Sequence, residues 1–211
     1  MRLNYKGFYA GLVLSLFSAI ILFALSITIG KKELFLSLNF DGGATLDFLF
    51  KYFTHFGDGM IWILVLIVAI FFLKRKDALP LLTSAFLLST IFTQVLKRFV
   101  FPGEPRPIKA INENDLIHTV QGVDVHSLNS LPSGHTATAF CVYLIFCLLV
   151  PRSWWVFAGF ITAFIAGYSR IYLAQHFPID VASGIIIAIF SVWIAMIIQS
   201  YIWKKKYPLK S

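Results

Sequence analysis

Long apolar runs separated by short polar stretches dominate the chain. A helix that crosses a membrane needs about 20 mostly apolar residues, with a range of about 17–25. Because runs of this size recur along the sequence, we predict an all-α, polytopic membrane protein. A bundle of about six transmembrane helices would form a single domain over residues 1–211. The predicted spans are residues 8–29, 57–73, 78–96, 134–150, 154–170 and 178–203.

The first apolar run follows two basic residues, Arg2 and Lys6, as a secretory signal peptide would. Its apolar stretch covers residues 8–29, whereas the apolar region of a signal peptide has about 7–15 residues. We therefore expect this run to be retained as the first transmembrane helix.

A shorter amphipathic segment lies between the first two predicted spans. Leu46, Leu49, Phe50 and Phe53 recur at helical spacing, with polar residues between them. This pattern predicts a short helix that lies in the membrane interface or packs against the bundle.

The longest polar stretch follows the third predicted span and covers residues 97–133. Loops of this length in a compact domain are usually functional or disordered. We predict that this one is an outer loop that contributes to an active site.

Composition agrees with a membrane protein, because 58% of the residues are hydrophobic and 13% are charged, against about 25% charged in soluble domains. The net charge of +8 is a topology signal rather than a nucleic-acid surface, because basic residues gather on one side of the predicted spans. Loops rich in Lys and Arg stay in the cytoplasm, so this side is predicted to be cytoplasmic and to hold both termini. The opposite side would face outward from the cytoplasmic (inner) membrane. The basic residues on the cytoplasmic side are Arg2, Lys6, Lys74, Arg75, Lys76, Arg152, Lys204, Lys205, Lys206 and Lys210.

Ionisable and other polar residues also occur at the outer ends of four of the predicted spans. Ionisable groups near membrane depth are costly and therefore mark function. Segments that are distant in sequence would thus bring their polar groups to one face of the bundle. These residues are Lys97, Arg106, Ser133, Gly134, His135, Arg170, His176 and Asp180.

Several of these residues suit a phosphate group. Arginine presents a planar fork that matches phosphate oxygens, and lysine presents a point charge. Ser133 is a candidate N-cap of the helix that follows, and Gly134 would let the backbone approach a ligand closely. A helix N-terminus is itself an anion site.

Two histidines have the chemistry for transfer of a phosphoryl group. His176 and Asp180 are four residues apart and share a face if the last helix extends that far. The carboxylate would fix the tautomer and leave the other ring nitrogen as a nucleophile. His135 is then free to act as a general acid.

The remaining candidate ligands point to no metal site. His55, His118 and His126 are expected to be solvated or packed in loops, and Cys141 and Cys147 to be small buried residues. We expect neither a metal nor another cofactor.

Three short motifs make the chain resemble the type 2 phosphatidic acid phosphatase superfamily, which shares an active-site plan with vanadium haloperoxidases. Pro132-Ser133-Gly134-His135 matches the second motif, and Ser169-Arg170 with His176 and Asp180 matches the spacing of the third. The first motif departs from the family pattern, because eight residues rather than six separate Lys97 from Arg106-Pro107. Arg98 is the alternative basic residue there.

The resemblance implies a mechanism for this chain. His176 would attack phosphorus to form a phosphohistidine, with Asp180 orienting it. His135 would protonate the leaving oxygen and then activate water. The residues implied to hold the phosphate are Lys97, Arg106, Ser133, Gly134 and Arg170.

The sequence therefore predicts a metal-independent lipid phosphatase whose active site faces the periplasm or exterior. Its substrate would be a phosphomonoester or diphosphate on a membrane lipid, such as a polyprenyl diphosphate, a glycerolipid phosphate or a lipid A phosphate. Alternatives are a lipid-to-lipid phosphotransferase with the same site and a transporter that binds an anion without breaking a bond.

Overall fold

Helices make up the regular secondary structure of the computed structural model, which describes residues 3–206. Four of them are long and apolar enough to cross a membrane. The predicted all-α membrane fold is therefore confirmed. These helices are α1 (Tyr5–Thr28), α5 (Leu79–Val95), α8 (Ser153–Tyr172) and α9 (Pro178–Lys206), and α5 continues into a π-helical turn over Leu96–Val100.

The second predicted span is the second half of a bent pair of helices, and the first half covers the segment predicted as a short amphipathic helix. Helix α3 (Gly43–Phe53) runs into a 3-10 turn over Thr54–Gly57, and α4 (Ile61–Ile67) continues in π-helical form to Phe72. The two halves meet at 63°. The helix thus begins at Ile61 rather than at residue 57, because the turn residues Asp58 and Gly59 break it.

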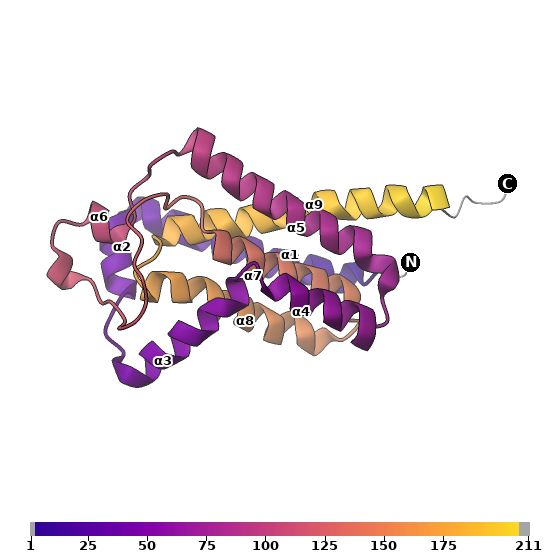
Figure 1. Cartoon of the computed structure of the whole chain (residues 1–211), viewed down its shortest axis with the longest axis horizontal. Coiled ribbons are helices and arrows are strands. Elements are labelled where there is room, and N and C mark those ends of the chain that lie inside the picture. Colours follow the sequence, from indigo (N-terminus) through magenta and orange to yellow (C-terminus); the bar gives the residue numbers. More distant parts are fainter. Residues whose placement is uncertain (1–2, 207–211) are drawn as a thin grey trace.

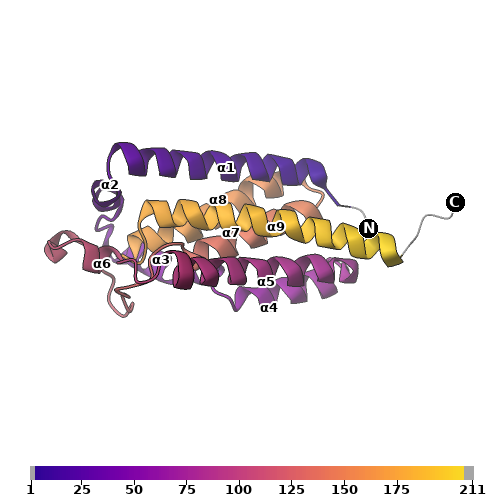
Figure 2. The same ribbon diagram turned by 90° about the horizontal axis from the view of Figure 1, so that it is seen from above.

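The predicted number of six spans is not confirmed. Counting the bent pair as one span gives up to five candidates in the described residues. Helix α7 (Gly134–Leu149) has 16 residues, which is short for a span. Helix α7 lies inside the bundle (Figures 1 and 2), where it packs against α1, α5, α8 and α9.

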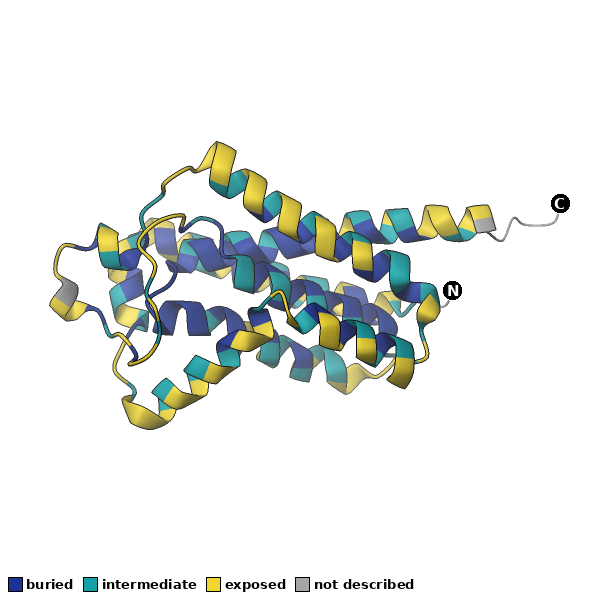
Figure 3. Ribbon diagram, in the orientation of Figure 1, coloured by how far each residue is buried: buried dark blue, intermediate teal, exposed yellow. Residues whose placement is uncertain are grey.

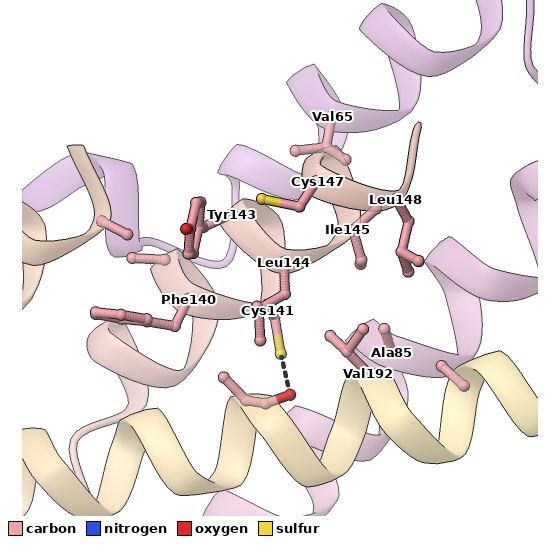
Figure 4. Close-up of a cluster of buried hydrophobic side chains, with 14 of the residues drawn as sticks. Val65, Ala85, Phe140, Cys141, Tyr143, Leu144, Ile145, Cys147, Leu148 and Val192 are labelled. Carbon is pink, nitrogen blue, oxygen red and sulfur yellow. Dashed lines mark hydrogen bonds between the residues drawn. The ribbon is translucent and has the colours of Figure 1, made fainter. Parts of the chain in front are cut away.

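The core forms around α7 because this helix is apolar on nearly all sides. Phe140, Leu144 and Leu148 are buried, and they pack in one cluster with residues of α4, α5 and α9 (Figure 4). Cys141 and Cys147 are free and buried in the same cluster, as the sequence predicted. Tight packing here fixes where α7 begins, and thus where the residues at its start lie.

The outer surface of the bundle is largely apolar as well. Exposed side chains include Phe17, Ile27, Phe71 and Phe157, which project from α1, the α4 extension and α8. Figure 3 shows exposed positions along the outward faces of the helices and buried positions between them. An apolar exterior over this length suits contact with lipid rather than water.

Both described chain ends lie at one end of the bundle (Figure 1). The Asn4 side chain donates to Val150 O at 3.2 Å, beside the α7–α8 loop. Gln199 of α9 donates to Asp77 O at 3.0 Å and accepts from Leu81 N at 2.9 Å. The basic residues used to orient the protein therefore gather at this end, although Arg2 and Lys210 lie outside the described residues.

The opposite end holds the shorter helices and the long loop. Helix α2 (Lys31–Leu38), α3 and α6 (Pro107–Ala110) lie at this end, where α2 contacts α8 and α9 and α3 contacts α8. The two arms of the loop are paired, because Arg106 N donates to Ser127 O at 2.9 Å and Ser130 N to Glu104 O at 3.0 Å. The polar stretch predicted from the sequence is thus an ordered cover on this end of the bundle.

Candidate active site

The start of α7 is fixed by a cap and by close contact with α9. Ser133 is the N-cap, as predicted, and its hydroxyl oxygen accepts from Thr136 N and Thr136 Oγ1. Ser133 N donates to Asp180 O at 3.0 Å. A Cβ at Gly184 would lie 2.5 Å from Ser133 O, so the missing side chain lets the two helices meet here.

Gly134 has a different setting. A Cβ at this position would meet only Thr93, at an ordinary contact distance of 3.5 Å. Packing inside the protein therefore does not require glycine here, and the space beside the helix N-terminus is open to a ligand.

A tight turn between α8 and α9 places His176. Ala174 has a positive φ of 54°, and the backbone N–H groups of Gln175 and His176 both donate to Arg170 O, at 2.9 and 3.0 Å. His176 is 1% exposed. The residue lies before the first turn of α9, so its nearness to Asp180 comes from this turn rather than from a shared helical face.

Asp180 is close to His176 but bonded elsewhere. Its Oδ2 lies 3.4 Å from His176 Nδ1, which is longer than a hydrogen bond. The same oxygen accepts from Ser130 Oγ at 2.5 Å and from Phe177 N at 2.9 Å. His176 Nδ1 is buried without a hydrogen-bond partner in the described part of the chain.

Arg106 is buried and held by two of the three nitrogens of its guanidinium. Nε donates to Leu128 O at 2.9 Å, and Nη1 donates to Gln175 O and Gln175 Oε1, both at 3.0 Å. Gln175 in turn donates to Asp124 O at 2.9 Å. These bonds join the loop to the α8–α9 turn, while the N–H groups on Nη2 make no hydrogen bond to residues 3–206.

Arg170 is buried near the end of α8 and is only partly satisfied. Its Nη1 donates to Thr54 Oγ1 at 2.6 Å, whereas its Nε is buried without a partner within residues 3–206. A buried charged donor without an acceptor costs more than the roughly 1–3 kcal/mol of an unpaired neutral group. This site therefore favours an anion.

Lys97 rather than Arg98 faces the other charges. Lys97 is half-buried in the π-helical turn, and its charge acts on Arg106, Arg170 and Asp180. Arg98 is exposed. The longer spacing of the first motif lies in the stretch that contains this turn.

His135 has an acidic partner that no motif predicted. Its Nε2 lies 2.7 Å from Asp58 Oδ1, and Asp58 Oδ2 lies 2.5 Å from His55 Nδ1. Asp58 comes from the bend between α3 and α4. His55, which we expected to be solvated or packed in a loop, thus reaches the site through Asp58.

The electrostatics of the cluster are dominated by cations. Burial lowers the pKa of His176 well below its usual value, and the positive charges of Arg106, Arg170 and Lys97 lower the pKa further. His176 is therefore neutral at neutral pH. A neutral imidazole in a dry, cationic site is available to attack an electron-poor phosphorus atom.

Sequence reasoning missed four residues that position the others: Thr54, Asp58, Ser130 and Gln175. None of them stands at a named position of the three motifs. Each acts through a contact across at least 50 residues of sequence, except that Asp58 also pairs with nearby His55. Such contacts leave no periodic or motif signal in a single sequence.

A second polar cluster lies outside these motifs and consists of Asp41, Asp47 and His118, whose ligand atoms lie within 4.8 Å of one another. His118 Nε2 and Tyr172 Oη already bind Asp47 Oδ1, at 2.9 and 2.6 Å. The cluster fastens the long loop to α3 and α8. This agrees with the expectation that His118 packs in a loop.

Comparison with known proteins identifies the family. The model of the PAP2 superfamily matches residues 78–204, which is more than half of the chain. The chain therefore belongs to the PAP2 superfamily. This confirms the resemblance seen in the three motifs and the predicted class, an all-helical membrane phosphatase.

Particular relatives agree with this class. Undecaprenyl-diphosphatase of Sulfolobus acidocaldarius is 28% identical over 152 residues, covering 72% of this chain and 70% of that protein. Lipid A 4'-phosphatase of Bacteroides thetaiotaomicron is 27% identical over 164 residues, covering 74% and 72%. The crystal structure of Aquifex aeolicus LpxE matches with a TM-score of 0.65 and 30% identity, over 78% of this chain and 93% of that one.

The adjacent basic residues Lys97 and Arg98 provide a matched test of anion binding. A bound ligand at about 100 times its Kd stabilises the folded protein by about 2.7 kcal/mol. Inorganic phosphate should therefore raise the Tm of the purified protein. We expect Lys97→Gln to weaken phosphate binding about tenfold by removing one cation, and Arg98→Gln to leave it unchanged. Equal effects of the two substitutions on the phosphate-dependent Tm would contradict this assignment.

Proposed function

We propose that this protein is a metal-independent hydrolase that removes a phosphate from a phosphomonoester or diphosphate carried by a membrane lipid. The observation that carries the proposal is a set of arginine N–H groups near His176 that have no hydrogen-bond acceptor within residues 3–206. Arg170 has a buried N–H without a partner within residues 3–206, and Arg106 keeps free donors on Nη2. A phosphoryl group supplies the acceptor oxygens that these donors lack.

In the first step, His176 acts as the nucleophile. Nδ1 faces Asp180, which leaves Nε2 to attack phosphorus. The P–O bond to the lipid breaks as the P–N bond forms, and His135 gives a proton to the leaving oxygen. The products of this step are the free lipid alcohol, or a lipid monophosphate from a diphosphate, and a phosphohistidine.

In the second step, His135 takes a proton from water. The resulting hydroxide attacks phosphorus, the P–N bond breaks, and inorganic phosphate leaves. His176 then returns to its neutral form and His135 to its protonated form. The proton balance closes over the cycle, so the enzyme needs no further acid or base.

Fixed cations account for charge stabilisation in both steps. In phosphoryl transfer, negative charge is spread over the equatorial oxygens of phosphorus. Lys97, Arg106 and Arg170 would contact these oxygens, and the Ser133 hydroxyl and the Gly134 N–H would add donors at the start of α7. Preorganised donors of this kind take the part that metal ions play in other phosphoryl-transfer enzymes.

An apolar cavity beside the site supports a lipid substrate. It has a volume of about 310 Å³ and lies between α4, α7 and α8, lined by residues such as Phe56, Ala139 and Trp155. Ala139 is one helical turn beyond His135 on α7, and Phe56 lies in the bend that carries Asp58. An acyl or prenyl chain in this cavity would leave the phosphate at His135. Two of the relatives described above act, by their names, on undecaprenyl diphosphate and on lipid A.

The distribution of charge supports an active site on the outer side of the cytoplasmic membrane. The α8–α9 turn, which carries His176, lies at the end of the bundle opposite the described chain ends (Figure 1). The basic end would stay in the cytoplasm by the positive-inside rule. The phosphate would then be removed at the periplasmic or exterior face.

The first test replaces the nucleophile. We expect His176→Ala to reduce phosphate release from lipid phosphates and diphosphates by at least about 10³-fold, because no P–N bond can form. Purified protein in detergent with a chelator is assayed without any acceptor lipid. Arg98→Gln serves as the control and should retain activity. Unchanged hydrolysis by His176→Ala would overturn the proposal, and release that requires an acceptor lipid would identify a phosphotransferase.

The second test follows the lowered pKa of His176. A lowered pKa disfavours the protonated ring, so the nucleophilic neutral form should persist as the pH falls below 6.5. The acid limb of kcat/KM should therefore lie well below this pH. Arg106→Gln removes a cation that lowers this pKa and should move the acid limb to higher pH, while the ionisation of the substrate stays the same in both enzymes. Superimposable acid limbs would count against His176 as the titrating nucleophile.

The third test addresses orientation. Glu113 lies exposed in the long loop and Lys74 lies exposed at the opposite end of the bundle. We expect a membrane-impermeant maleimide to label Glu113→Cys in intact cells and Lys74→Cys only after lysis. The native cysteines are buried, so the unmodified protein serves as the background. Labelling of Lys74→Cys from outside would reverse the proposed orientation.

A further inference from the structure

The bend between α3 and α4 brings an acidic residue onto His135. Asp58 Oδ1 lies 2.7 Å from His135 Nε2. The other carboxylate oxygen lies 2.5 Å from His55 Nδ1. None of the three sequence motifs includes Asp58 or His55. In the mechanism proposed above, His135 donates a proton, but no residue is assigned to orient its ring or to stabilise its protonated form.

Close packing makes this contact a fixed feature of the fold. A Cβ at Gly57 would lie 2.7 Å from His135 O and 2.8 Å from His135 Cβ, so the bend can approach α7 only with glycine at this position. In the same bend, the Thr54 hydroxyl accepts a hydrogen bond from Arg170 Nη1 at 2.6 Å. The bend therefore contacts Arg170 through Thr54 and His135 through Asp58, two residues that are four positions apart.

His135 needs such a partner because of the charges around it. Arg170 from α8 and Lys97 from the end of α5 both act on it by Coulomb repulsion, and His176 lies near it as well. A general acid must carry a proton before it can give one to the leaving oxygen. The Asp58 carboxylate is hydrogen-bonded to the ring and supplies the opposing negative charge.

We propose that Asp58 is a positioning residue that fixes the orientation and tautomer of His135 and stabilises its protonated form. With Nε2–H donated to Asp58, Nδ1 is the nitrogen that exchanges a proton with the reacting oxygens. As the P–O bond breaks, the bond pair stays on the leaving oxygen and the proton passes to it from Nδ1. This inference rests on the proposed function of His135.

His55 completes the arrangement from the solvent side. Its side chain is 63% exposed, and its Nδ1 engages the second oxygen of Asp58. The carboxylate is thus held at both oxygens, which restricts its rotation. Removing His55 should therefore weaken the effect of Asp58 without removing its charge.

The test compares two substrates that differ in their need for a general acid. The leaving group of an alkyl phosphate is an alkoxide, which needs a proton. The leaving group of a nitrophenyl phosphate is a phenolate, which is stable as an anion. The ratio kcat/KM covers only the steps up to the phosphohistidine, so later hydrolysis does not enter. We expect Asp58→Asn to lower kcat/KM about 10²–10³-fold for the alkyl phosphate and less than about tenfold for the aryl phosphate.

Three controls separate the possible causes. Asp115→Asn, at an exposed acid in the long loop, should leave both substrates unchanged. Asp58→Asn should keep the rise in Tm with inorganic phosphate, which shows an intact binding site. His55→Ala, at an exposed position, should show a smaller loss with the same dependence on the leaving group, and it provides the test if Asp58→Asn fails to fold.

Other outcomes overturn the inference. Equal losses for both substrates would mean that Asp58 has only a structural role, and unchanged rates would mean that it has none. Tighter phosphate binding with faster turnover would mean that the carboxylate competes with the substrate for the site. Activity that survives His176→Ala would instead refute the proposed function, so the two failures are distinguishable.

Discussion

The confinement of three cations beside two engaged carboxylates, at the end of an apolar helix bundle, is the constraint on which the site depends. The Asp58 carboxylate is held by His135 and His55. Lys97, Arg106 and Arg170 come from three separate elements, and the Asp180 carboxylate is already held by Ser130 and Phe177. Buried charge without a partner is costly. The buried Nε of Arg170 has no partner within residues 3–206, and a bound anion would compensate its charge.

The rigidity of this arrangement follows from close contacts between backbones. Gly184 lets α9 meet the start of α7, and Gly57 lets the α3–α4 bend meet His135. The start of α7 is thereby fixed on two sides by close backbone contacts. Positioning of this kind is what catalysis of phosphoryl transfer requires, since little of the chemistry is performed by the protein itself.

The long loop is part of the site rather than a connection between spans. It carries Arg106, whose guanidinium is bonded to Leu128 in the other arm of the loop and to Gln175 in the α8–α9 turn. It also carries Ser130, which donates to Asp180. The head group of a lipid substrate would therefore lie under the ordered loop, among polar groups. Its chain would lie in the apolar cavity between α4, α7 and α8.

The sequence by itself determined the helical membrane fold, the family, and the residues of the three motifs, because apolar periodicity and short-range spacing are local properties of the chain. It predicted the Ser133 cap and the burial of Cys141 and Cys147 for the same reason. Only the tertiary structure decided that a 63° bend replaces the start of one predicted span, and that Lys97 faces the site while Arg98 does not. The pairing of Asp58 with His135 was likewise decided in three dimensions, since it joins residues far apart in the chain through packing that no local pattern encodes.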